Sequence, residues 1–130
     1  SSFTGYLGAL HRADHAVGHL WNFIQTQVPE MTGNTTIIAV PECGRNGEPN
    51  AILDQNDWVS FDHSDANALR VFGMMAGAGV EAGLMVGNED NPIGLVTDLV
   101  PTVAELLGFK QDVLGAGLIA PGSMSLFDRI

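Results

Sequence analysis

The chain has 130 residues, 45% hydrophobic and 15% charged, a composition typical of a globular domain with a core rather than of a disordered segment. Its net charge of −10 disfavours binding to nucleic-acid phosphates and to anionic membrane surfaces. A single cysteine excludes an internal disulfide, and no apolar run reaches the roughly 20 residues that a membrane-spanning helix needs.

The first predicted element is a helix over residues 4–28. Its apolar residues recur at steps of three and four and share one arc: Leu10, Ala13, Val17, Leu20, Trp21, Ile24 and Val28. His11, His15 and His19 fall on nearly the opposite arc. Two histidines four residues apart on a helix can share a metal ion, but a position opposite the apolar stripe favours a solvated face. We therefore expect these histidines to be exposed and to bind no specific metal.

A strand is predicted over residues 35–40, "TTIIAV", because the run is short, β-branched and not alternating. This pattern is typical of a central strand that is covered on both faces. The polar loop that follows, over residues 41–65, is rich in Gly, Pro, Asn and Asp. Loops longer than about 12–15 residues inside a compact domain are uncommon and often functional.

A second buried strand is predicted over residues 68–76, because the glycines in and after this stretch weaken a helix. A second helix is predicted over residues 97–107, with Thr97 as its cap, Pro101 near its first turn and Gly108 as its stop. The order is helix, strand, loop, strand, helix. It predicts an α/β fold, part of a layered and mainly parallel sheet flanked by helices.

The segment "PECGRN", residues 41–46, stands where the first predicted strand ends. Ligands of α/β sheets gather beyond the carboxyl ends of the strands. A metal can be held there by the carboxylate of Glu42 and the thiolate of Cys43, and Arg45 can bind a tetrahedral anion. An equally open alternative is a tight turn, in which Glu42 pairs with Arg45 and Cys43 is buried as a small hydrophobic residue.

The segment "FDHSDAN", residues 61–67, is a second candidate. His63 can ligate a metal or act as a general base, and a carboxylate such as Asp62 can orient its second nitrogen. The alternative is a turn with an Asx motif and a surface histidine.

Taken together, these segments resemble the C-terminal part of the alkaline phosphatase superfamily, which includes sulfatases and nucleotide pyrophosphatases. Five motifs occur in the order of that family. They are "DHAVGHLWNFIQ" before the strand "NTTIIAV", "ECGR" at the end of that strand, "FDHSDAN", "DLVPTVAELLG" and the closing "SLFD".

The resemblance implies a metal-dependent hydrolase of small phosphate or sulfate esters, with a divalent metal of the zinc, calcium or manganese class. It assigns the metal site to four side chains: Glu42, Cys43, Asp62 and His63. It assigns substrate contacts to Arg45 and Asn46. Most active members have Asp-His where this chain has Glu42-Cys43, so the resemblance leaves a second reading open, a non-catalytic binding domain that has lost its metals.

In the family, the nucleophile, the first metal-binding aspartate and a D-x-x-x-H ligand pair all precede the region of resemblance. We therefore expect the chain to be the C-terminal part of a single larger domain, inactive without its upstream part, and periplasmic or secreted in the manner of the family. We also expect an exposed apolar patch, because strands that are apolar on both faces need more cover than two helices supply.

Overall fold

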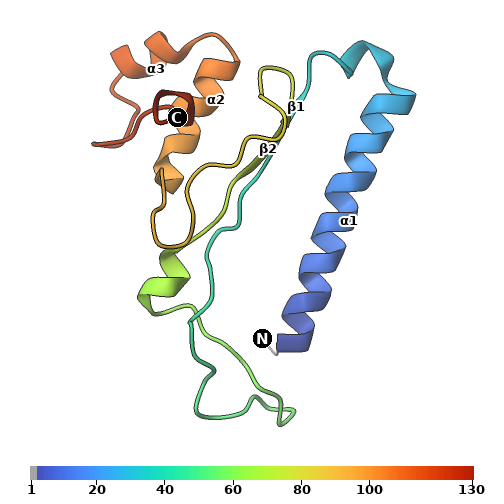
Figure 1. Ribbon diagram of the computed structural model, residues 1–130, viewed down its shortest axis with the longest axis vertical. Coiled ribbons are helices and arrows are strands. Elements are labelled where there is room, and N and C mark those ends of the chain that lie inside the picture. The colour runs from blue at the N-terminus through green and yellow to red at the C-terminus, as the bar shows by residue number, and fades with distance from the viewer. Residues whose placement is uncertain (1–2) are drawn as a thin grey trace. The chain divides into compact units, whose positions relative to one another are not determined.

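The computed structural model describes residues 3–130, and the chain divides into two compact units, Ser1–Val80 and Glu81–Ile130. The first unit contains a long helix and two strands: α1 (Phe3–Gln27), β1 (Thr36–Ala39) and β2 (Met74–Gly77) (Figure 1). The second unit contains two short helices: α2 (Leu99–Leu106) and α3 (Lys110–Gly115). Single 3₁₀ turns cover Pro29–Met31, Ala66–Leu69, Val96–Asp98 and Leu126–Asp128.

Helix α1 confirms the predicted helix over residues 4–28, but its apolar stripe is poorly covered. Ile24 is buried at 5% exposure, whereas Leu10 and Leu20 on the same stripe are 45% and 49% exposed. A two-stranded sheet is too narrow to cover a helix of 25 residues. The three histidines of the opposite arc are exposed, as predicted. Among the described residues, no helix combines the length and the apolar character that crossing a membrane requires.

The predicted layered, mainly parallel sheet is wrong. Strands β1 and β2 pair antiparallel, with Thr36 opposite Gly77 and Ala39 opposite Met74, and form a two-stranded sheet in a small mixed α/β arrangement. A parallel pair needs a crossover, usually through a helix. The described connection from β1 to β2 contains only one 3₁₀ turn, so the chain returns through a loop and the strands run in opposite directions.

The buried strand predicted over residues 68–76 is confirmed as a strand only near its end, and it is not buried, because the residues of β2 alternate between exposed and half-buried. Asp65 accepts a hydrogen bond from the Ala68 backbone N–H (3.0 Å) and caps a 3₁₀ turn that takes up the first residues of the predicted strand. Strand β2 ends at Gly77, whose φ of +122° lies in the region that favours glycine. A Cβ atom at Gly77 would lie 2.1 Å from the Thr35 carbonyl oxygen, so the end of the ladder requires a residue without a side chain.

In the second unit, α2 confirms the core of the helix predicted over residues 97–107. Its first residues belong to a 3₁₀ turn, and Gly108 ends it with a φ of +81°. The buried residues of α2 are Pro101, Thr102 and Ala104. Helix α3 packs beside α2 and was not predicted.

Asp98 anchors the second unit. Its carboxylate is fully buried and accepts hydrogen bonds from the backbone N–H groups of Leu95 (2.7 Å) and Met124 (3.1 Å). Arg129 completes the set through Nε and one terminal nitrogen, at 2.7 Å and 3.0 Å. Burial acts to raise the pKa of Asp98, but the Arg129 guanidinium and the two N–H donors outweigh it and lower that pKa.

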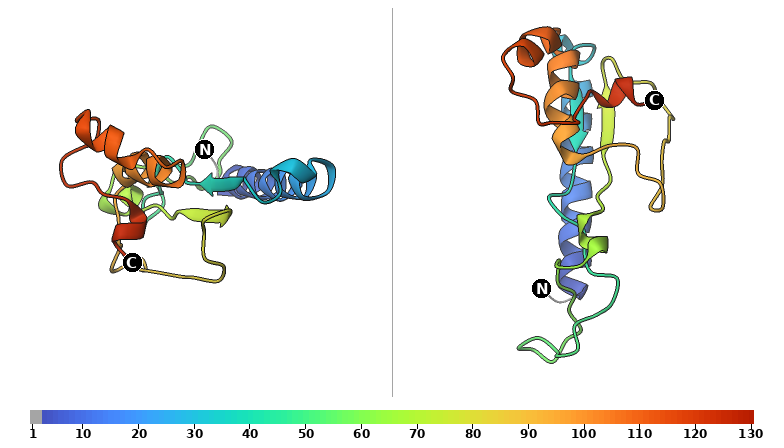
Figure 2. Two further views of the ribbon diagram at one scale, coloured as in Figure 1. Left: turned by 90° about the horizontal axis from the view of Figure 1, so that it is seen from above. Right: turned by 90° about the vertical axis from the view of Figure 1, so that its left-hand side faces the viewer.

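The C-terminal segment, which lies near α2 (Figure 2), is thereby tied to Asp98 at the start of that helix. A second tie runs through Thr102, whose hydroxyl donates to the Asp98 carbonyl oxygen (2.7 Å) and accepts from the Leu126 N–H (2.8 Å). Lys110 of α3 adds a third tie, since its ammonium group bonds both Glu105 (2.9 Å) and Asp128 (2.5 Å). The second unit therefore contains a network of polar contacts, part of which surrounds the buried carboxylate of Asp98.

Candidate functional site

Two stretches of the connection between β1 and β2 are joined by hydrogen bonds. The Gly44 N–H donates to the Ala68 carbonyl oxygen (2.7 Å), and the Asn46 N–H donates to the Asp62 carbonyl oxygen (2.8 Å). The Asn67 side chain closes the set by donating to the Arg45 carbonyl oxygen (2.8 Å). We call residues 44–47 and 61–68, joined in this way, the loop clamp. It brings together the two segments that sequence analysis singled out.

Asn46 holds the loop clamp with its side chain. Its Oδ1 accepts from the backbone N–H groups of Ser64 (2.7 Å) and Asp65 (3.0 Å), and its Nδ2 donates to the Ser64 hydroxyl (3.2 Å). The resemblance to the alkaline phosphatase superfamily implies a substrate contact for Asn46. Because this amide is engaged within the chain, Asn46 positions the 62–65 segment, and a substrate contact through the same atoms would require breaking these bonds.

Asp65 stabilises the clamp from the other side. Its carboxylate accepts from the Gly47 N–H (3.0 Å) and the Ala68 N–H (3.0 Å). The Gly47 bond is the main cause of a lowered pKa for Asp65; partial burial opposes it, and the N–H groups of Ala68 and Asn67 add to it. The carboxylate is therefore ionised at neutral pH and engaged at the clamp.

At Gly44 the two backbones approach too closely to leave room for a side chain. A Cβ atom there would lie 2.6 Å from the Arg70 carbonyl oxygen and 2.9 Å from the Asn67 carbonyl oxygen. We expect Gly44→Ala to force the segments apart and to cost about 1–3 kcal/mol of local stability. Hydrogen exchange of the clamp amides measures this loss.

Gly47→Ala is the matched control for that substitution. A Cβ atom at Gly47 meets nothing within 4 Å, so we expect a change within about 0.5 kcal/mol. Equal effects of the alanine at Gly44 and at Gly47 would contradict the close approach of the two backbones.

A pocket of about 260 Å³ opens beside the loop clamp. Three aromatic side chains line it: Phe3, Tyr6 and Phe61, of which Phe61 belongs to the clamp. The other lining residues, Arg45, Asn46, Gly47 and Asn67, are also clamp residues. The rings of Phe3 and Phe61 lie 5.6 Å apart between centroids and are tilted by 52°. The Phe3 N–H donates to the Val59 carbonyl oxygen (3.0 Å), which holds the start of α1 against this loop.

Arg45 brings a positive charge to the pocket. Its guanidinium carbon lies 5.0 Å from the centre of the Tyr6 ring, in a cation–π contact. Within residues 3–130, no carboxylate lies at salt-bridge distance from Arg45. The ion pair with Glu42 that one interpretation of the sequence allows is therefore not formed, and the guanidinium of the half-buried Arg45 has no carboxylate partner within the described residues.

The four side chains predicted for a metal site differ in their surroundings. Glu42 is exposed and Cys43 is half-buried. Asp62 Oδ1 lies 3.4 Å from His63 Nδ1 and also accepts from the His63 backbone N–H (3.0 Å). A carboxylate that is hydrogen-bonded to Nδ1 can orient a histidine for metal binding through Nε2. Here the two groups are in contact, and both side chains are more than half exposed.

Glu42, Cys43, Asp62 and His63 do not form a complete metal site among the described residues. No group of three or more His, Cys, Asp or Glu side chains within residues 3–130 is arranged to hold a metal ion. The donor types suit a metal of the zinc class, and four donors are enough for a tetrahedral site, but within the described residues these four side chains are not gathered around one point. The predicted metal site therefore stays a prediction.

Sequence analysis missed the aromatic side of the pocket. Phe3 and Tyr6 extend the apolar stripe of α1 toward its start, at the spacing of three that marks one helix face. That spacing is enough to predict that both residues belong to the helix. It does not predict the contact between Tyr6 and Arg45, because these residues are distant in sequence. Phe61 and Asn67 lie in a stretch in which only the ionisable residues drew attention.

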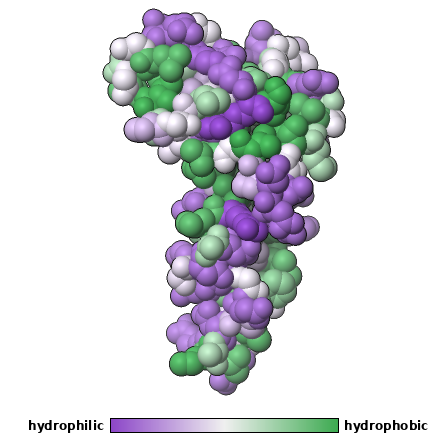
Figure 3. Space-filling view, turned by 60° about the vertical axis from the view of Figure 1, so that its left-hand side comes forward, coloured by the Kyte–Doolittle hydropathy of each residue, from purple (hydrophilic) through white to green (hydrophobic). Residues whose placement is uncertain are grey.

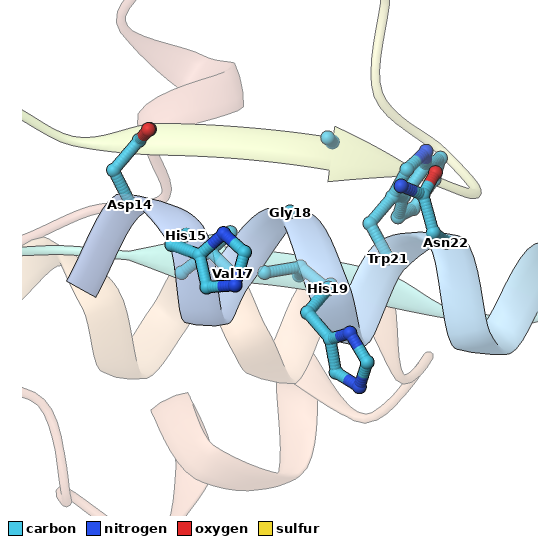
Figure 4. Close-up of a pocket in the computed structure, with 9 residues that line it drawn as sticks. Asp14, His15, Val17, Gly18, His19, Trp21 and Asn22 are labelled. Carbon is cyan, nitrogen blue, oxygen red and sulfur yellow. The ribbon is translucent and has the colours of Figure 1, made fainter. Parts of the chain in front are cut away.

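A second hollow lies between α1 and the sheet. It measures about 520 Å³, and its apolar lining includes Val17 and Trp21 of α1 together with Ile37 and Ala76 of the strands. His15 and His19 belong to its rim, with ring centroids 6.5 Å apart (Figure 4). This groove shows that the helix and the narrow sheet do not pack closely along this face.

Comparison of the chain with known protein families, with curated proteins and with solved structures finds no match. The resemblance to the alkaline phosphatase superfamily therefore rests on the five sequence motifs. The antiparallel two-stranded sheet of the described residues adds nothing to it.

Proposed function

We propose that this chain is part of a metal-dependent hydrolase of phosphate or sulfate esters, and that its loop clamp forms one wall of the substrate site. The observation that carries the proposal is the direct bonding of the "ECGRN" segment to the "FDHSD" segment, through the Asn46 N–H and the Asp62 carbonyl oxygen (2.8 Å). The order of the five motifs supports the reaction class.

In this proposal Arg45 binds the tetrahedral anion, since a planar guanidinium offers paired N–H donors to oxyanions. Asp62 would orient His63, whose free ring nitrogen would bind the metal. The carboxylate of Glu42 and the thiolate of Cys43 would have to converge on that nitrogen, since the described residues hold no group of three such side chains. A divalent metal, when bound, polarises the ester oxygens. The nucleophile and the remaining ligands come from outside this chain, so the chain by itself is inactive.

The test uses the full-length protein that carries this chain. Release of p-nitrophenol from p-nitrophenyl phosphate and p-nitrophenyl sulfate is measured with Zn²⁺, Ca²⁺ or Mn²⁺ and again after chelation. We expect hydrolysis to require the metal, and His63→Gln to lower kcat/KM by at least about tenfold. His11→Gln, which changes an exposed histidine of α1, is the matched control and leaves the rate unchanged. Hydrolysis that persists without metal, or at full rate in the His63 variant, would overturn the proposal.

The alternative function is a binding domain without catalysis. Cys43 favours it, because most active members of the family have histidine at that place in the motif. The same protein would then bind inorganic phosphate or sulfate through Arg45 and show no turnover with any of the three metals. Binding lost in Arg45→Gln, in a protein that never releases p-nitrophenol, is the outcome that selects this alternative.

A further inference from the structure

We propose that the pocket beside Arg45 selects small ligands that join a planar ring to an oxyanion. The inference deepens the proposed function, on which it rests for the placement of the anion at Arg45. It assigns the organic half of the ligand to the aromatic walls formed by α1 and residue Phe61.

The cation–π contact between Arg45 and Tyr6 holds the guanidinium beside the pocket, with its central carbon 5.0 Å from the centre of the ring. A guanidinium in such a contact keeps N–H donors at its edge, and those donors suit phosphate or sulfate oxygens. The ring also restricts the motion of a long side chain, which lowers the entropy lost on binding. Tyr6 is therefore a positioning residue that acts through Arg45.

The polar residues that line the pocket offer few free donors to a second anionic group of the ligand. The Asn67 amide is bonded to the Arg45 carbonyl oxygen, and the Gly47 N–H is bonded to Asp65. With these donors engaged, the Arg45 side chain is the cation that an incoming anion meets.

The walls and the volume define the rest of the ligand. Phe3, Tyr6 and Phe61 present aromatic surface, which favours a planar or apolar group over a sugar or a peptide. A volume of about 260 Å³ lies below the range of roughly 300–1,000 Å³ that is usual for ligand sites. We therefore expect a single ring with one anionic group rather than a nucleotide.

Direct binding measurements test the inference without any need for turnover. Phenyl phosphate and inorganic phosphate are titrated into the purified full-length protein at moderate salt, and the dissociation constants are compared. We expect phenyl phosphate to bind at least about tenfold more tightly than inorganic phosphate, because a buried ring adds apolar contact area.

Four variants separate the contributions. Arg45→Gln weakens both ligands about tenfold or more, whereas Phe61→Leu removes most of the preference for phenyl phosphate and leaves inorganic phosphate unchanged. Tyr6→Leu weakens both ligands, and Tyr6→Phe, which keeps the ring, restores them. Arg12→Gln on α1 is the matched control, since Arg12 is an exposed arginine that does not line the pocket, and it changes neither constant.

Two results would overturn the inference: equal affinity for the two ligands in the unchanged protein, or full affinity in Arg45→Gln. Circular dichroism of each variant confirms that it folds. If Tyr6→Leu does not fold, the conservative Tyr6→Phe variant and the Arg45 and Phe61 variants still decide the test. Failure here is distinguishable from failure of the proposed function. Ring-selective binding without hydrolysis supports the inference about the pocket and contradicts the proposed hydrolase activity. Metal-dependent hydrolysis without ring selectivity supports the hydrolase activity and contradicts the inference about the pocket.

Discussion

Replacing Asp98 with alanine is expected to destabilise the second unit by about 3–5 kcal/mol, since removing one partner of a buried ion pair leaves the other charge uncompensated. Asp98 is fully buried, and Arg129 keeps only 20% of its side chain exposed. The Leu95 and Met124 N–H groups lose their acceptor as well. The loss is measured by denaturant unfolding and by hydrogen exchange of α2. Asp90→Ala, at an exposed position of the same unit, is the control and changes stability within about 0.5 kcal/mol.

The same carboxylate makes the second unit sensitive to acid. The folded-state pKa of Asp98 lies below its ordinary value of 3.8, so its stabilising contribution is present above that value and is lost as the pH falls through the folded-state pKa. Stability should therefore decline below about pH 4. Asp98→Asn keeps the shape and removes this part of the pH dependence. An equal loss of stability at low pH in the Asp98→Asn variant would show that other carboxyl groups cause the decline.

The purified chain alone is expected to bind a hydrophobic dye and to sediment above its monomer mass of 13.7 kDa. Helix α1 leaves large apolar side chains 45–49% exposed: Phe3, Leu7, Leu10, Leu20 and Phe23. Apolar residues reach the surface of the chain in patches (Figure 3). Monomeric proteins rarely expose contiguous apolar patches beyond a few hundred Å², and larger ones promote association.

A pair of substitutions with a matched control tests the role of the stripe. Leu10→Glu with Leu20→Glu should reduce both dye binding and sedimentation, because charges interrupt the apolar surface. His11→Glu with His19→Glu introduces as many acidic side chains on the opposite arc of α1 and should change neither. A monodisperse chain of 13.7 kDa without dye binding would show that these side chains do not drive association.

The sequence was sufficient for elements with a strong local signal. The steps of three and four over residues 4–28 predicted α1, and the β-branched run predicted β1. The direction of strand pairing is not local, because it depends on the path of the whole connection from Ala39 to Met74. Helix α3 spans only six residues, too few for a periodic pattern to appear.

Burial could not be predicted from the stripe either. The spacing of apolar residues identifies the face of a helix that a core would cover, but the two-stranded sheet leaves much of that face of α1 open. The same limit applies to the candidate site. The sequence pointed to Arg45 and His63 as ionisable groups in one loop, whereas the Tyr6 contact depends on tertiary structure.

Arg45 also affects how fast a ligand arrives. Of the five basic residues, Lys110 and Arg129 are neutralised by carboxylates, while the chain as a whole carries a charge of −10. An approaching anion is therefore repelled at long range and attracted by Arg45 only within a few ångströms. Dissolved salt screens the long-range repulsion first, because its Debye length is about 8 Å at physiological ionic strength. The encounter rate of an anionic ligand with this chain consequently rises as salt is added, the reverse of the behaviour of a basic binding protein.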